Sequence, residues 1–243
     1  MSSTRYAIYF SPEPESDLWL FGSRWLGRDS ATGDKIKRLT VSAITPERQR
    51  EITAAAALYG FHATIKPPFR LAKGHDLETL DEALEAFAAS YQPVTLPALE
   101  VAELDGFIAL QPTEPSERLQ KLAADCVRAF DHFREPPSKM ELERRRQVEL
   151  SDTQRKMLDA WGYPYVMDEF RFHMTLTGRL EAAERKAVLA DLQELGKDIA
   201  GKAVCIDVLT LLQQKSAEEP FEVVKCYPLI SLSQAQWPRQ KTR

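Results

Sequence analysis

Hydrophobic and polar residues alternate along the chain with two periods, and each period predicts one kind of element. A period of two, with aromatic or aliphatic residues at the apolar positions, is typical of strands. Such runs predict strands over residues 6–10, 61–69, 99–104, 107–110, 170–176, 204–212 and 221–226.

Apolar residues spaced by three and four positions are typical of amphipathic helices, which often have a capping residue in front and glycine behind. Asp76 and the Ser151–Gln154 capping box are starts of this kind, and Thr45 precedes Pro46. The pattern predicts helices over 18–26, 46–58, 77–90, 115–130, 151–161 and 181–195. The turn dipeptide Asp105-Gly106 predicts that the strands on either side of it form a hairpin.

The order of the predicted elements repeats. Phe61-His62-Ala63-Thr64-Ile65 matches Phe172-His173-Met174-Thr175-Leu176, and each copy precedes a helix and then two strands. We interpret this as an internal duplication. It predicts an α+β protein with two lobes in one domain spanning 1–243, with the motifs around 59–70 and 170–177. Mainly antiparallel sheets would surround a central cleft that holds the motifs, with helices on the outer faces.

The paired motif carries the candidate chemistry. Residues two apart in a strand face the same way, so His62 and Thr64 project together, and so do His173 and Thr175. Imidazole titrates near neutral pH, and two imidazoles in opposite proton states can act as base and acid. Threonine hydroxyls can donate hydrogen bonds to phosphate oxygens. These four residues therefore favour phosphodiester chemistry without a metal.

Three further residues are candidates for binding substrate. Lys66 follows the first motif and would share the face of His62 in an unbroken strand. Within the run Arg144–Arg146, Arg145 is the candidate for a second phosphate, although the run is equally typical of a solvated helix face paired with glutamates. Tyr163 could stack on a base or sugar, or pack in the core. The remaining histidines, His75 and His132, are expected to be surface or capping residues.

Composition narrows the class of protein. The chain has 243 residues, 44% of them hydrophobic, and a formal net charge of −4. This apolar content excludes an intrinsically disordered chain, and no apolar run approaches the roughly 20 residues that span a bilayer. No secretory signal is visible, and three cysteines without CxxC spacing do not predict a disulfide framework. We expect a cytoplasmic protein that does not bind long nucleic acid.

The chain resembles the 2H phosphoesterase superfamily, whose members carry one His-x-Thr/Ser-x motif in each lobe of a duplicated α+β fold. A closer resemblance is to the DUF1045 family, which is often found beside genes for phosphonate degradation. The resemblance implies that one of His62 and His173 deprotonates the attacking water, the other protonates the leaving oxygen, and Thr64 and Thr175 hold the phosphate. The matching segments are 25–28, 59–70, 106–110, 144–146, 161–165 and 170–177.

The resemblance implies a metal-independent phosphoesterase that acts on a small, cyclic phosphodiester and is linked to phosphonate catabolism. The expected partner is a small phosphorylated substrate, either a cyclic nucleotide or a cyclic ribose phosphate, and we expect no cofactor, no metal and no membrane association. A non-catalytic nucleotide- or RNA-binding module using the same cleft is the alternative. A metal-dependent hydrolase is a third interpretation, and the oligomeric state stays open.

Overall fold

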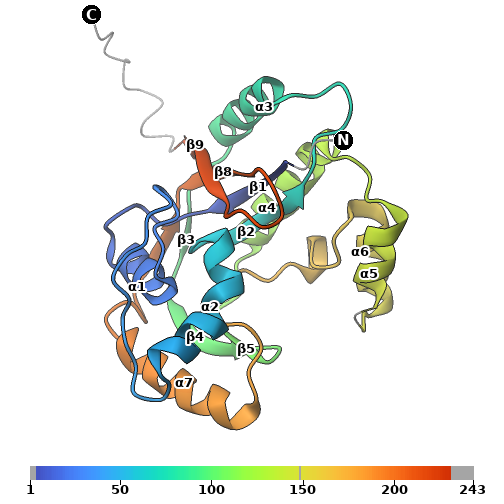
Figure 1. Cartoon of the computed structure of the whole chain (residues 1–243). Helices are drawn as coiled ribbons and strands as arrows, with labels where there is room; N and C mark the ends of the chain where they lie inside the picture. Colours follow the sequence, from blue (N-terminus) through green and yellow to red (C-terminus); the bar gives the residue numbers. More distant parts are fainter. Residues whose placement is uncertain (1–3, 148, 231–243) are drawn as a thin grey trace, which may run out of the picture.

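The computed structural model describes residues 4–147 and 149–230, and one antiparallel sheet runs through it (Figure 1). Its strands hydrogen bond in the order β4-β5-β6-β2-β1-β8-β9. A separate two-stranded sheet pairs β3 (Val94–Leu96) with β7 (Val204–Ile206). The main strands are β1 (Arg5–Phe10), β2 (Ala63–Phe69), β4 (Leu99–Leu104), β5 (Phe107–Pro112), β6 (Met174–Thr175), β8 (Val208–Gln214) and β9 (Glu222–Pro228).

Several helices begin at side chains that cap their first turn. Thr45, Asp76, Ser116 and Ser151 each accept a backbone N–H bond from the first turn of the helix that follows. Two 3₁₀ turns, η1 (Asp131–Phe133) and η2 (Met167–Glu169), connect elements. The helices are α1 (Asp17–Leu26), α2 (Pro46–Tyr59), α3 (Leu77–Ala89), α4 (Glu117–Ala129), α5 (Lys139–Arg146), α6 (Asp152–Trp161) and α7 (Ala182–Leu195).

The repeated element order is visible in the topology. The series β2-α3-β3-β4-β5 is followed later by β6-α7-β7-β8-β9. The motif strands are β2 in the first series and β6 in the second. Each lies next to the hairpin of the other series: β4–β5 pairs with β6, and β8–β9 is joined to β2 through β1. The predicted α+β class and antiparallel strands are confirmed. The two sets of strands meet at one residue pair, Ala63 with Met174, so they form one continuous sheet.

Some predicted elements differ in extent. Only Met174 and Thr175 of the predicted strand 170–176 pair as β6. At its C-terminal end, the N–H groups of Leu176 and Thr177 both donate to one carbonyl, that of Ile108, so the regular ladder stops there. The predicted strand 204–212 is interrupted at Asp207, whose carbonyl accepts a hydrogen bond from Leu229. The sequence patterns did not predict β3 or α5.

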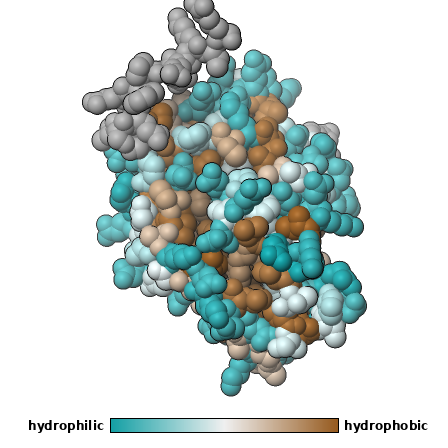
Figure 2. Space-filling view, turned by 90° about the vertical axis from the view of Figure 1, so that its left-hand side faces the viewer, coloured by the Kyte–Doolittle hydropathy of each residue, from teal (hydrophilic) through white to brown (hydrophobic). Residues whose placement is uncertain are grey.

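The main hydrophobic core contains the apolar residues of both motifs. Phe61, Ala63 and Ile65 are buried, as are their counterparts in the second motif, whereas the polar residues between them are half-buried. The predicted alternation is therefore confirmed. On the face drawn in Figure 2, hydrophobic residues reach the surface between hydrophilic ones. Within the described residues, no helix combines the length and the apolar character needed to cross a bilayer.

Helix α1 contacts both motifs. A Cβ atom on Gly22 would lie 2.2 Å from the ring of Phe61, so only glycine allows this close approach. One turn along, the indole Nε1 of Trp25 donates a 2.8 Å hydrogen bond to the carbonyl of Leu176, the residue that follows β6. Because both contacts are buried, α1 fixes the two motif strands relative to each other.

We predict that Trp25→Phe destabilises the protein by about 1–3 kcal/mol beyond the loss of ring volume, because it leaves the buried Leu176 carbonyl without its indole donor. Urea unfolding measures this. Trp19→Phe is a matched control: Trp19 is also buried, and its Nε1 has no partner in the described part of the chain. Equal destabilisation by the two substitutions would contradict the role of the hydrogen bond.

Candidate active site

The four polar residues of the paired motif lie together on one face of the sheet. Ala63 and Met174 pair in antiparallel register, so His62 lies opposite Thr175, and Thr64 lies opposite His173. All four side chains are half-buried and line one cavity of about 420 Å³. The structure therefore brings together the two motifs that the sequence places far apart.

The ring of His62 is held on three sides. Its Nδ1 lies 2.8 Å from the carbonyl oxygen of Gly60, and its Nε2 lies 3.2 Å from Oγ1 of Thr64. A carbonyl oxygen only accepts, so Nδ1 carries the proton, and Nε2 of the neutral ring has the lone pair. The ring also stacks on Tyr9, with centroids 3.8 Å apart. Burial lowers the pKa of His62 to about 4, against the opposing effect of the Gly60 bond, and nearby His173 lowers it further.

His173 repeats the same arrangement. Its Nδ1 lies 2.8 Å from the carbonyl oxygen of Arg171, again two residues earlier, so its Nε2 also has the lone pair. Burial lowers the pKa of His173 as well, whereas the Arg171 carbonyl and the charge of Asp105 act in the opposite direction. Both histidines are therefore neutral at neutral pH in the ligand-free protein.

The loop before His62 is fixed by residues distant in sequence. Gly60 has φ +77°, and a Cβ there would lie 2.4 Å from Cβ of Ser30, so this position requires glycine. Arg28 is buried and donates to the carbonyl oxygens of Ala57 (3.2 Å) and Phe221 (2.6 Å). These contacts join the end of α2 to the segment before β9 and determine where the Gly60 carbonyl points.

The predicted contact between Lys66 and the substrate is wrong. Tyr9 pairs with Thr64 and Ile8 with Lys66, so Ile65 is an extra residue in β2 and forms a bulge. The bulge turns Lys66 to the core side, where its side chain is 2% exposed and Nζ donates to the Val127 carbonyl at 3.3 Å. Burial there lowers the pKa of Lys66 to about 8.

The other two candidates for binding substrate do line the cavity. Arg145 donates to the carbonyl of Gly162, and its guanidinium lies 5.7 Å from the centre of the Tyr163 ring. Arg146, in contrast, is exposed and pairs with Asp159 at 2.7 Å, as expected for a solvated helix face. The side chain of Arg144 lies outside the described residues. His75 and His132 pack near each other, 5.4 Å between centroids, and do not line this cavity.

The sequence patterns missed a group of residues that complete the cavity. Arg5 and Tyr9 come from β1, and Tyr59 comes from the end of α2. Tyr59 stacks on Phe221 with centroids 5.1 Å apart, which continues the aromatic packing behind His62. Alternation in β1 places Arg5 and Tyr9 on one face, but only the pairing of β1 with β2 shows that this face is that of His62.

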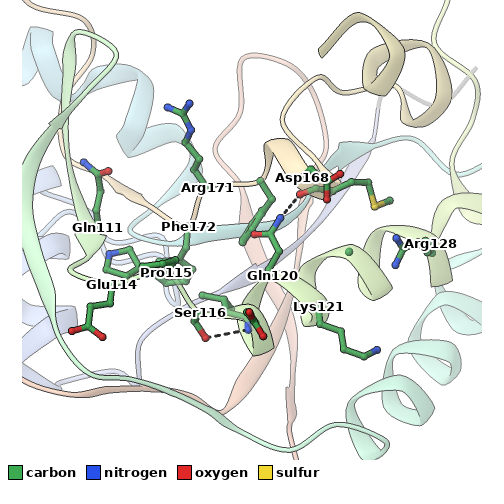
Figure 3. A pocket seen from close by; sticks show the side chains of 16 residues that line it. Gln111, Glu114, Pro115, Ser116, Gln120, Lys121, Arg128, Asp168, Arg171 and Phe172 are labelled. Carbon is green, nitrogen blue, oxygen red and sulfur yellow. Dashed lines mark hydrogen bonds between the residues drawn. The ribbon is translucent and has the colours of Figure 1, made fainter. Parts of the chain in front are cut away.

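A larger hollow of about 760 Å³ lies beside the site but contains neither motif histidine (Figure 3). Phe170 and Arg171, in the segment before His173, line both this hollow and a smaller one next to His173. On its α4 side, Gln120 donates to the Met167 carbonyl. Its lining mixes acidic and basic residues, which are Glu114, Glu117, Asp168, Lys121, Arg128 and Arg171.

Comparison with known proteins identifies one family, two curated relatives that share a name, and solved structures of distant similarity. The sequence profile of the family described as "Protein of unknown function (DUF1045)" matches residues 64–222, which include the whole second motif. A protein of Janthinobacterium sp. (strain Marseille) named "Ribose 1,5-bisphosphate phosphokinase PhnN" is 37% identical over 224 residues, 90% of this chain and 49% of that protein. A protein of the same name from Laribacter hongkongensis (strain HLHK9) is 34% identical over 187 residues, 76% and 43% of the two chains. The chain thus spans about half the length of the curated relatives it matches.

Solved structures show distant similarity. A structure entitled "Crystal structure of phosphoesterase" has 13% identity and a TM-score of 0.43, covering 94% of this chain and 99% of the other. "E.coli LigT complexed with NADP+" has 13% identity and a TM-score of 0.44, with the same coverage of 94% and 99%.

Proposed function

The chain belongs to the DUF1045 family, and we propose that it is a metal-independent phosphoesterase that hydrolyses a small cyclic phosphodiester by general acid and base catalysis. The observation that carries this proposal is the matched pair of histidines. Each has its Nδ1 proton bound to a backbone carbonyl, each leaves Nε2 to act, and both line one cavity with two threonines.

The surroundings of the histidines favour His62 as the base. Its pKa is lowered to about 4, so above that pH the ring is neutral and Nε2 has its lone pair available for a proton. His173 lies near Asp105, whose charge favours the protonated form, and a bound phosphate anion would favour it further. We therefore assign His173 as the acid.

The reaction then has a simple proton balance. Nε2 of His62 takes a proton from water as the water oxygen bonds to phosphorus. The ester bond between phosphorus and a ring oxygen breaks, and Nε2 of His173 donates its proton to that oxygen. Each histidine is returned to its starting state by proton exchange with solvent. The product is an acyclic phosphomonoester with a free hydroxyl group.

We propose that Thr64 and Thr175 hold the phosphate between the histidines, and this is supported by the strand register, in which each lies opposite a histidine of the other motif. The Thr64 hydroxyl, which donates to Nε2 of His62 in the ligand-free protein, would turn to a non-bridging oxygen when phosphate binds and so free that nitrogen. The Thr175 hydroxyl would donate to the phosphate as well, and such donors stabilise the charge that develops in the transition state. Arg145 and Tyr163, which line the same cavity, would contact the remainder of the substrate.

The names of the curated relatives raise a kinase as a second candidate. The segment Gly196–Lys202 has the glycine and lysine spacing of a phosphate-binding P-loop. However, Ala203 stands where a P-loop has serine or threonine, and the segment follows helix α7 and precedes strand β7, the reverse of the P-loop order. The hydrolase is therefore the better supported function. A cyclic ribose phosphate is favoured as substrate because those relatives are named for a ribose bisphosphate. We also propose the link to phosphonate catabolism that the family resemblance implies.

We predict that the purified protein opens members of a panel of 2′,3′-cyclic nucleotides and cyclic ribose phosphates in the presence of EDTA. For kcat/KM, activity should rise with pH as His62 loses its proton near pH 4 and fall as His173 loses its proton, at a pKa below 6.5. His62→Ala should lower the rate by about 10²- to 10⁴-fold.

Two outcomes would contradict this function. Stoichiometric binding of a cyclic ester without turnover at any pH would favour a binding module. Complete loss of activity in EDTA, restored by a divalent metal, would favour a metal-dependent hydrolase. Circular dichroism of His62→Ala, compared with the wild type, tests whether a loss of rate is due to unfolding.

A second prediction separates the phosphate-holding role of the threonines from a packing role. Thr64→Val and Thr175→Val keep the side-chain shape but remove a donor to a charged group worth about 1.5–3 kcal/mol, so kcat/KM should fall about ten- to a hundredfold. Thr→Ser at either position should retain much of the activity. Thr95→Val, at an exposed strand position outside the cavity, is the control. If valine is harmless and serine harmful, the threonines serve only the sheet.

A further inference from the structure

The cavity that holds the two motifs is cationic, although the chain as a whole is acidic. Its charged lining residues are Arg5 and Arg145, and no carboxylate lines it within the described residues. Two carboxylates, Asp105 and Glu169, line the adjoining hollow next to His173, where Arg171 and Arg179 accompany them. A single phosphodiester has one negative charge. We propose that the substrate carries a second phosphate, which Arg5 and Arg145 hold while the histidines and threonines hold the cyclic one. This inference rests on the proposed function and names its substrate class.

Arg5 is fixed at the far end of the strand that supports His62. Arg5, Ala7 and Tyr9 share one face of β1, and Tyr9 stacks on His62. Four residues of strand span about 13 Å, so Arg5 begins well beyond the histidine. Its Nε donates to Oε1 of Gln214 at 2.8 Å, and Nη2 donates to the same oxygen. Two of the five guanidinium donors are thus used for orientation, and the group lies 5.7 Å from the ring centre of Phe221.

Arg145 lines the same cavity from a different element, helix α5. Helix α5 is tied to the residue that follows β2, because Glu141 pairs with Arg70 at 2.7 Å, and Arg145 lies over Tyr163 in the segment after α6. Both arginines are therefore held by partners that are themselves part of the fold. A rigid guanidinium fork binds phosphate oxygens in pairs, which makes arginine better suited than lysine to a terminal phosphate.

The space between the two ends of the cavity fits a small carbon skeleton. The cavity of about 420 Å³ exceeds what one phosphate group fills, and Tyr163 and Tyr165 provide apolar surface on one side. The ligand that matches this arrangement is a pentose with a cyclic phosphodiester at one end and a phosphomonoester at the other. A long RNA strand is the other class of phosphate ligand, and the test below includes it.

Binding of stable probes tests the second phosphate separately from catalysis. Calorimetry on the whole protein should show that ribulose 1,5-bisphosphate binds at least tenfold more tightly than ribulose 5-phosphate. Arg5→Gln and Arg145→Gln should each remove most of this preference. Arg146→Gln is the matched control, because Arg146 is the exposed neighbour that pairs with Asp159 and does not line the cavity.

The outcomes distinguish this inference from the proposed function. Equal affinity for the two probes, or a preference unchanged in both folded glutamine variants, would overturn the second-phosphate site even if cyclic esters are hydrolysed. A preference that depends on both arginines, without turnover of any cyclic ester, would support the site and contradict the enzyme. Tighter, arginine-dependent binding of an oligoribonucleotide ending in a cyclic phosphate would overturn the small-substrate class.

Discussion

One hydrogen bond, made twice, determines what the cleft can do. Each motif histidine donates its Nδ1 proton to the backbone carbonyl two residues earlier, and both bonds are 2.8 Å long. An imidazole that could rotate or change tautomer would present either an N–H donor or a lone pair to the ligand, without preference. With Nδ1 fixed, Nε2 is the nitrogen to which our proposal assigns the proton transfers in both rings, and the two rings differ only through their surroundings. Under our proposal, the acid and base roles of the two imidazoles are therefore set by their different surroundings and not by different tautomers.

Several buried contacts fix the backbone on which the two motifs stand. The conformation of Gly60, the buried guanidinium of Arg28 and the indole of Trp25 act on the backbone next to the motifs. The exchange of hairpins between the two series brings the motif strands together at the centre of the sheet, where β2 and β6 share a single pair. Burial at this position lowers the pKa of both histidines, so the same packing that aims them also keeps them neutral.

Local patterns predicted the elements and the motif face well, because alternation, caps and the Asp105-Gly106 turn act over a few residues. They failed where the outcome depends on distant partners. Lys66 was misplaced because a bulge against β1 turns it inward, and no residue of the 61–69 pattern shows the bulge. Arg5 and Tyr9 were missed for the same reason, since their relation to His62 exists only in the paired sheet. The point at which β6 ends depends on the Ile108 carbonyl, which belongs to the β4–β5 hairpin.

The most direct test of this account is a ¹⁵N NMR titration of the histidine ring nitrogens in the folded, ligand-free protein, with His62→Ala and His173→Ala used for assignment. The account predicts that at pH 7 both motif histidines are neutral with the proton on Nδ1. On acidification His62 should remain neutral until about pH 4, and His173 should protonate below 6.5. A proton on Nε2 of either neutral ring, or a positively charged His62 at pH 7, would contradict the account.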